Sequence, residues 1–264
     1  MPVEPANAER SQELIANYER INQRVLAAAE SRQSTRLVAV SKVKPSSDIL
    51  ALYHHGVRHF GENYPQELES KAKELPQDIA WHYIGTLQSN KCKMLAAIPN
   101  LYAIETLTSI KAANHLHSTL STLSPPRDTR LDVFLQVNTS GEASKSGLPP
   151  LSSSSASDAP SELVDVAKHI LKECDTLQLK GLMTIGSWDH STAGPDEVNP
   201  DFDTLRNTRR LLAQRLNAEG HESVKEQALE LSMGMSHDFE KAIEMGSTNV
   251  RVGSDIFGAR PPRN

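Results

Sequence analysis

The chain has 264 residues, of which 38% are hydrophobic, so it is long enough for one large domain or two small ones with a substantial core. Its net charge of −5 does not predict a basic face, which argues against a protein that binds nucleic acid or a membrane surface. Cys92 and Cys174 have no metal or redox spacing, and two free thiols are typical of a reducing compartment.

The apolar pattern begins with a helix and continues as alternating strands and helices. Between Ala8 and Ala29, apolar residues recur at spacings of three and four, which predicts a helix. Short apolar runs then predict eight strands, at 37–41, 57–60, 80–84, 101–104, 131–137, 179–185, 228–232 and 249–252. Helical patterns lie between them at 48–55, 64–74, 89–98, 109–120, 161–175, 201–219 and 237–245, with Asp48, Ser89, Ser109 and Ser161 as predicted N-caps.

This alternation indicates a parallel sheet, and eight such units fit a closed barrel better than an open doubly wound sheet. We therefore expect an α/β protein with a single (β/α)8 TIM-type barrel across residues 1–264 and an additional N-terminal helix. No full helix is predicted after the last strand. Residues 149–160 are rich in Ser and Pro without periodicity, which predicts a flexible loop insertion, and 187–200 predict a second long loop.

No apolar run approaches the roughly 20 residues that a membrane-spanning helix needs. The N-terminus carries acidic residues early and has no apolar stretch, which argues against a signal peptide and against most transit peptides. We therefore expect a cytoplasmic protein and leave a mitochondrial pool as the alternative.

Candidate functional residues follow four of the predicted strands. The carboxyl ends of barrel strands carry the active sites of such folds, so Lys42 and the segments 61–63, 232–236 and 251–258 should meet at one mouth. Loops after the last two strands often bind phosphate through backbone N–H groups. The glycines and serines of these two loops would suit that use, although ordinary turns would explain them equally well.

The position of Lys42 allows two interpretations. A lysine at a strand exit is usually solvated. Alternatively, partial burial depresses its pKa and leaves a neutral amine that attacks an aldehyde. A phosphate site across the mouth would suit an aldehyde that carries a phosphate, such as pyridoxal 5′-phosphate (PLP) or a sugar phosphate. The residues alone leave a PLP protein and a Schiff-base aldolase open.

Six motifs add a more specific indication. They are LVAVSK at 37–42, FGENY at 60–64, WHYIGTLQSNK at 81–91, SKSGL at 144–148, GLMTI at 181–185 and the long run at 231–260. In order and across almost the whole chain, they resemble the pyridoxal phosphate homeostasis protein family. The resemblance implies one PLP-binding barrel similar to the N-terminal domain of alanine racemase. The Ser/Pro-rich insertion departs from the family pattern but lies outside these motifs.

The resemblance also assigns residues. It implies that Lys42 holds PLP as an internal aldimine and that Asn63 lies near the ring hydroxyl of the cofactor. It implies a phosphate cradle made by Ser236, Gly253 and Ser254. The function it implies is storage and delivery of PLP, with apo PLP-dependent enzymes as partners and a monomer or weak dimer as the assembly.

Arg251 matches the arginine that faces the pyridine nitrogen in racemase-like barrels. An arginine stays protonated and can only donate, so the ring nitrogen should stay unprotonated and the ring should be a weak electron sink. We therefore expect PLP binding without substantial turnover; the alternative is a fold-type III PLP enzyme such as an amino-acid racemase. A racemase needs a base on each face of the cofactor, and we do not expect the additional domain that supplies the second one.

Other polar residues are expected to be structural. The histidines show no metal-binding spacing, and no metal site is expected. His82 lies within a strand and is predicted to pack in the core. Lys180 is predicted at the wrong end of its strand for an aldolase. Lys145 is predicted to be a mobile loop cation, and the resemblance leaves a role in PLP transfer open for it.

Overall fold

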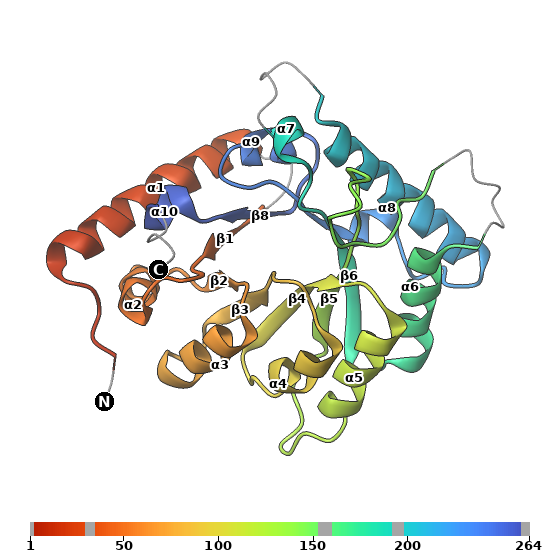
Figure 1. Ribbon diagram of the computed structural model, residues 1–264, viewed down its shortest axis with the longest axis horizontal. Coiled ribbons are helices and arrows are strands. Elements are labelled where there is room, and N and C mark those ends of the chain that lie inside the picture. Colours follow the sequence, from red (N-terminus) through yellow and green to blue (C-terminus); the bar gives the residue numbers. More distant parts are fainter. Residues whose placement is uncertain (1–2, 30–34, 153–159, 192–197, 260–264) are drawn as a thin grey trace.

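Eight parallel strands close into a barrel in a computed structural model that describes residues 3–29, 35–152, 160–191 and 198–259 (Figure 1). Each strand pairs with its neighbours in chain order, and β8 pairs with β1 to close the ring. The strands are β1 (Arg36–Val40), β2 (His59–Glu62), β3 (Ala80–Tyr83), β4 (Leu101–Leu107), β5 (Leu131–Gln136), β6 (Leu177–Met183), β7 (Glu230–Ser232) and β8 (Asn249–Val252). The predicted (β/α)8 barrel is confirmed.

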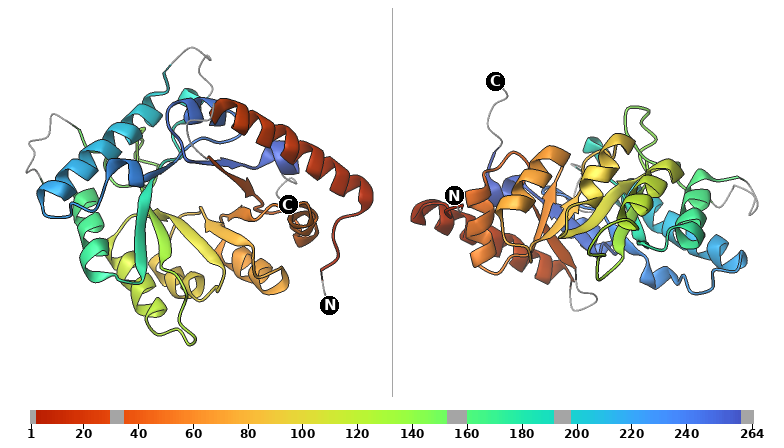
Figure 2. Two further views of the ribbon diagram at one scale, coloured as in Figure 1. Left: turned by 180° about the vertical axis from the view of Figure 1, so that it is seen from behind. Right: turned by 90° about the horizontal axis from the view of Figure 1, so that it is seen from below.

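Helices form a ring outside the strands (Figures 1 and 2). They are α1 (Ala8–Ala29), α2 (Ser46–His54), α3 (Pro65–Glu74), α4 (Cys92–Ala96), α5 (Ile110–Leu120), α6 (Glu162–Glu173), α7 (Trp188–Ser191), α8 (Pro200–Ala218), α9 (Phe239–Glu244) and α10 (Ser254–Phe257), with 3-10 turns η1 (Ser89–Lys91) and η2 (Glu226–Ala228). The N-terminal helix α1 packs against α2, α9 and α10. It therefore covers the part of the ring where the very short α10 leaves room.

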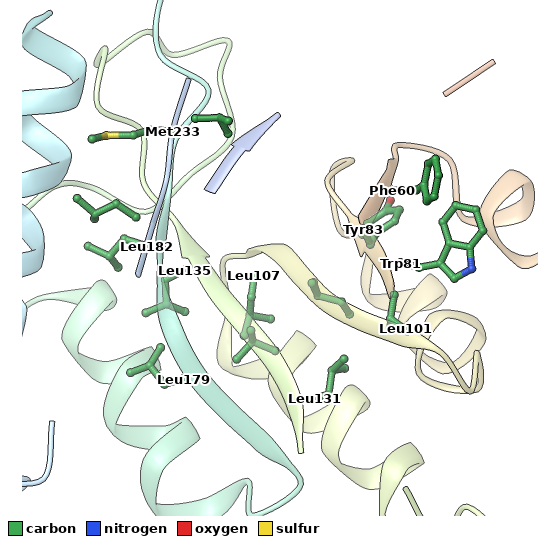
Figure 3. Packing of buried hydrophobic residues seen from close by; sticks show 14 of the residues in the cluster. Phe60, Trp81, Tyr83, Leu101, Leu107, Leu131, Leu135, Leu179, Leu182 and Met233 are labelled. Atoms are coloured by element: carbon green, nitrogen blue, oxygen red, sulfur yellow. The ribbon is translucent and has the colours of Figure 1, made fainter. Parts of the chain in front are cut away.

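Side chains alternate between two environments along the strands. The outward face is apolar and packs under the helices, as Leu131, Leu135, Leu179 and Leu182 do on β5 and β6 (Figure 3). Buried polar side chains stand at intervening positions, among them Arg251 on β8. Because successive residues of a strand point to opposite faces, these polar groups point into the barrel.

Two of the four predicted N-caps, Asp48 and Ser89, are wrong, and the other two hold the predicted position. Ser109 does cap α5, since its Oγ accepts from the backbone N–H three residues on at 3.2 Å. The helix α2 starts before Asp48, whose carboxylate instead accepts a hydrogen bond at 2.7 Å from Arg10 Nη2 on α1. Ser89 lies inside η1, and Ser161 stands at the cap of α6 without a side-chain cap bond.

Of the predicted insertion at 149–160, residues 153–159 lie outside the described residues, so its flexibility stays a prediction. Leu151, near its start, is buried and belongs to the main hydrophobic core. Within the predicted loop at 187–200 the short helix α7 forms. Among the described helices, none is both long and apolar enough to span a membrane.

Candidate functional site

A cavity of about 200 Å³ opens where β1 and β8 end. Since Val38 pairs with Arg251 across these strands, residues from opposite ends of the chain become neighbours there. The lining residues are Val40, Lys42, Lys44, Ile84, Met235, Ser236, His237, Arg251, Gly253, Ser254 and Gly258. Five predicted site residues are thus brought together: Lys42, Ser236, Arg251, Gly253 and Ser254.

Lys42 sits on a tight turn directly after β1. The carbonyl of Ser41 accepts a hydrogen bond from the backbone N–H of Lys44 at 3.0 Å, which closes the turn. The Lys44 ammonium donates to the carbonyls of Phe257 at 3.0 Å and Ala259 at 2.7 Å. The turn is therefore tied to the segment after β8. Lys44 was not predicted as a site residue, although its place two residues after Lys42 was a usable signal.

Hydroxyl groups and cations face the same cavity. Ser254 Oγ lies 3.3 Å from Ser236 Oγ. Ser254 is also the first residue of α10, where backbone N–H groups have no partner within the helix. Lys42 and Lys44 line the same cavity, so this arrangement favours an anion. The carboxylate of Asp255, 3.3 Å from Ser254 Oγ, opposes that preference.

Packing restricts two glycines in these loops. Gly234 has a φ of +97°, and a Cβ there would lie 2.6 Å from the Cβ of Ala242 on α9. A Cβ on Gly253 would approach the Cβ and the carbonyl oxygen of Val40 to 3.3 Å. At these two glycines the loops therefore lie close to their neighbours within the chain.

Arg251 is buried on β8 and is not part of a surface ion pair. Its Nη2 donates to the carbonyl of Thr184 at 2.7 Å, and its Nη1 donates to Ser232 Oγ. Burial lowers the pKa of Arg251, while the nearby charge of Glu105 acts in the opposite direction. The guanidinium has five N–H donors, so further ones remain to face the cavity it lines.

Behind Arg251 lies a polar network in the barrel interior that the sequence analysis missed. Its centre is Glu105 on β4, which is fully buried. One carboxylate oxygen accepts from His82 Nδ1 at 2.6 Å and from Asn249 Nδ2 at 2.8 Å, and the other accepts from Ser232 Oγ at 2.5 Å. Arg251 Nη1 lies 3.8 Å from the second oxygen. Burial alone would raise the pKa of Glu105, but the hydrogen bond and charge of His82 and the charge of Arg251 lower it to about 2.

The prediction that His82 packs in the core is confirmed, because the side chain is fully buried. Its Nε2 lies 2.9 Å from Nδ1 of His59, which is nearer the bottom of the barrel. Burial, followed by the charges of His82 and Arg36, lowers the pKa of His59 to about 3. The polar contacts therefore continue from Arg251 at the cavity through the barrel interior to His59.

Asn63 does not line the cavity. Its backbone packs against Gly85, where a Cβ would come within 1.9 Å of the Asn63 carbonyl oxygen, and Gly85 follows the lining residue Ile84. The side-chain oxygen of Asn63 is buried and accepts no hydrogen bond from the described part of the chain. Asn63 thus packs beside the segment that follows a lining residue, and among the described residues its buried acceptor has no donor.

A second cavity of about 220 Å³ lies between the ends of β5 and β6. Thr184, whose carbonyl binds Arg251, lines it, as does Lys145. The ammonium of Lys145 donates to Glu142 at 2.5 Å and to the carbonyl of Gly186 at 2.8 Å, so its mobility stays a prediction. Within the described ranges, no group of three His, Cys, Asp or Glu side chains could hold a metal ion.

Lys180 is placed as predicted, away from the mouth of the barrel. Its ammonium lies 3.2 Å from a carboxylate oxygen of Glu230 and 3.8 Å from one of Asp132. Both acidic residues belong to the first part of their strands. The position at the far end from Lys42 disfavours a Schiff-base aldolase that would use Lys180.

The family model described as alanine racemase, N-terminal domain, matches residues 10–261. A human relative named pyridoxal phosphate homeostasis protein is 44% identical over 252 residues, which are 91% of this chain and 84% of the relative. A relative of the same name from Schizosaccharomyces pombe is 44% identical over 225 residues, 85% and 84% of the two chains. The chain belongs to the pyridoxal phosphate homeostasis protein family. The prediction made from its motifs is confirmed.

Solved structures agree with this family assignment. The PLP-bound structure of PipY from Synechococcus elongatus is 30% identical, with a TM-score of 0.64 over 89% of this chain and 98% of PipY. An unknown protein from Bifidobacterium adolescentis is 33% identical, with a TM-score of 0.75 over 97% and 98%. Alanine racemase from Corynebacterium glutamicum is 15% identical, with a TM-score of 0.65 over 94% of this chain and 62% of the racemase, a likeness in fold alone.

Proposed function

We propose that this chain binds PLP in the cavity at the ends of β1 and β8 and acts in PLP homeostasis, holding and releasing the cofactor without substantial turnover. The observation behind the proposal is that Lys42, the hydroxyl pair of Ser236 and Ser254, and Arg251 line one cavity. The name shared by the relatives and the PLP bound to PipY support it.

The residues fit the chemical groups of PLP. Nζ of Lys42, when neutral, would add to the aldehyde carbon, and loss of one water would leave a C=N bond. Ser236 and Ser254 would donate hydroxyl hydrogen bonds to the phosphate, and Gly253 would let the backbone of this loop stand close to it. Asn63 lies outside the cavity lining, and its buried side-chain oxygen would have to turn into the cavity to accept from the ring hydroxyl.

Two features disfavour the alternative of an amino-acid racemase. Arg251 would donate to the pyridine nitrogen and keep it unprotonated, which weakens the ring as an electron sink. Near the mouth, Tyr83 is buried, and burial raises its pKa to about 12 while its hydroxyl donates to the carbonyl of Thr86 at 3.0 Å. Such a tyrosine is a poor second base, because catalytic groups work best with a pKa near the operating pH.

We propose further that apo PLP-dependent enzymes receive the cofactor and that the chain works in the cytoplasm as a monomer or weak dimer. Lys42 lies at the open mouth of the barrel and is half-buried, so water can reach the C=N bond. Hydrolysis would regenerate the amine and release free PLP. Release would thus require no large movement of the barrel.

Trapping the adduct tests the proposal. Wild-type protein mixed with PLP should gain a visible absorption band, and borohydride reduction followed by peptide mapping should place the adduct on Lys42. Lys42→Ala should lose both while its circular dichroism is unchanged, and Lys73→Ala, a change at a lysine with 71% of its side chain exposed, should keep both. An adduct that maps to Lys44 or Lys145 in the wild type would overturn the assignment.

A further inference from the structure

The turn that presents Lys42 contains an unusual backbone conformation. Ser41 and Lys44 are its first and last residues, joined by the 3.0 Å hydrogen bond from Lys44 N–H to the Ser41 carbonyl. Val43, the third residue, has a φ of +55°. This position of a turn normally holds Gly or Asn, and a β-branched residue there is a genuine outlier. Such conformations persist where the surrounding structure holds them, often at functional sites.

Helix α3 supplies the groups that hold this turn. Glu67 Oε1 accepts a hydrogen bond from the backbone N–H of Val43 at 2.7 Å. The ammonium of Lys71 donates to the same Glu67 oxygen at 2.6 Å and to the carbonyl of Ser41 at 2.9 Å. Its third contact is Glu62 Oε1 at 2.7 Å, so all three ammonium donors are used. Glu67 and Lys71 of α3 therefore hydrogen-bond to the two residues that flank Lys42.

The buried position of this cluster is costly. Glu62 is fully buried and Lys71 almost so, and removing charges from water is favourable only with good partners. Burial raises the pKa of Glu62 to about 7, against the attraction of Lys71. The charged groups that face Glu62 are Lys71 and Glu67 from α3, and Ser41 Oγ on the β1 side donates to it at 2.6 Å. Each of the three residues contacts the Lys42 turn, Glu62 and Lys71 at Ser41 and Glu67 at Val43, although Glu62 Oε2 has no hydrogen-bond partner in the described part of the chain.

Helix α3 also carries an ion pair that lies outside the cluster. On the exposed face of α3, Lys73 and Glu69 form an ion pair with the same spacing, at 2.8 Å. That pair supports the helix without touching the turn. It provides a matched control for Lys71 and Glu67, which are the same residue types at the same spacing on the same helix.

We propose that Glu62, Glu67 and Lys71 form a positioning cluster that fixes the Lys42 turn and so sets how fast and how tightly the Lys42 amine captures an aldehyde. This inference rests on the proposed function, because it assumes that Lys42 is the attachment site. The cluster does not touch the phosphate cradle at Ser236 and Ser254. Its effect should therefore be equal for aldehydes with and without a phosphate.

The experiment compares adduct formation by PLP and by pyridoxal. Glu67→Ala removes the acceptor of the Val43 N–H and should slow adduct formation at least tenfold with both aldehydes. Glu67→Gln keeps an acceptor oxygen and should stay within about threefold of the wild type, at a similar melting temperature. Glu69→Ala should match the wild type. Lys71→Met, if it folds, should resemble Glu67→Ala.

The outcomes separate this inference from the proposed function. If the wild type forms its adduct on Lys42 but Glu67→Ala forms it at the wild-type rate, the cluster is only structural and the inference fails while the function stands. A loss confined to PLP would place the cluster in the phosphate site and also refute the inference. If the wild type forms no adduct on Lys42, the proposed function fails, and the positioning inference fails with it.

Discussion

Substituting the buried Glu105 tests whether the polar network in the barrel interior stabilises the fold. In Glu105→Gln the side chain keeps its shape but loses its charge. Its NH₂ group must face one of the donors whose hydrogen bonds the wild-type carboxylate accepts. Those donors are His82, Asn249 and Ser232. The Arg251 guanidinium at 3.8 Å would remain buried without its counter-charge.

The size of the effect follows from burial. Breaking a buried ion pair by removing one partner costs about 3–5 kcal/mol. Arg251 keeps the carbonyl of Thr184 and the hydroxyl of Ser232, so we expect the lower end, about 3 kcal/mol of unfolding free energy. In a chain of this size that corresponds to a fall in melting temperature of roughly 6–12 °C.

The pH dependence gives an independent check. The pKa of Glu105 is lowered from 4.5 to about 2 in the folded state, so the folded state binds fewer protons than the unfolded state between these values. Its stabilising contribution is therefore fully present above pH 4.5 and is lost as the pH falls towards 2. The difference in unfolding free energy between wild type and Glu105→Gln should shrink over that window.

Denaturant unfolding at pH 7 and at several acidic pH values measures both effects. Glu69→Gln, which alters the exposed pair with Lys73, is the control and should change the unfolding free energy by less than about 0.5 kcal/mol. If Glu105→Gln is no more destabilising than Glu69→Gln, the interior network does not stabilise the barrel as argued.

Three further predictions concern the site, the insertion and turnover. Ser236→Ala and Ser254→Ala should each weaken PLP binding about tenfold, the low end for a hydrogen bond to a charged group, since these hydroxyls are exposed; pyridoxal binding should change much less, and equal losses in titrations of both would contradict a phosphate role. Deleting 153–159 and joining the ends with a short Gly/Ser link should leave the melting temperature nearly unchanged, because the sequence there has little to bury. In contrast, Leu151→Ala should lower the unfolding free energy by about 2 kcal/mol or more. A large drop in melting temperature for the deletion would show that the segment packs on the barrel. Incubation with L-alanine in deuterated water should give no α-deuteration above a Lys42→Ala control, and turnover of about 1 s⁻¹ or faster would favour an enzyme.

The fold was predictable because its signal is local. Apolar runs that alternate with helical periodicity are visible in short windows, and α1 was predicted with the bounds it has. The end of β1 was predictable as a site for a related reason. Parallel strands in a barrel bring their carboxyl ends to one mouth, so Lys42 and the loops after β7 and β8 had to converge once eight strands were assigned.

What escaped prediction depends on partners far away in the sequence. Glu105 stands in an apolar run, and its partners Ser232 and Asn249 lie 127 and 144 residues further along the chain. Asp48 was expected to cap a helix, but Arg10, 38 residues before it, takes its carboxylate. Neither pairing leaves a periodic trace. Glu105 directly follows the strand predicted at 101–104, and a charge at that place was a hint that does not name the partner.

The pairing of β8 with β1 has a consequence for the newly made chain. Lys42 leaves the ribosome long before Arg251, Gly253 and Ser254, which lie far behind it in the chain. Until β8 pairs with β1, Arg251, Gly253 and Ser254 do not lie beside Lys42. We expect a growing or truncated chain that lacks β8 to hold PLP no better than any exposed lysine does. PLP that binds only the closed barrel would also stabilise that barrel by mass action, so binding would favour the fully folded chain over chains whose barrel is still open.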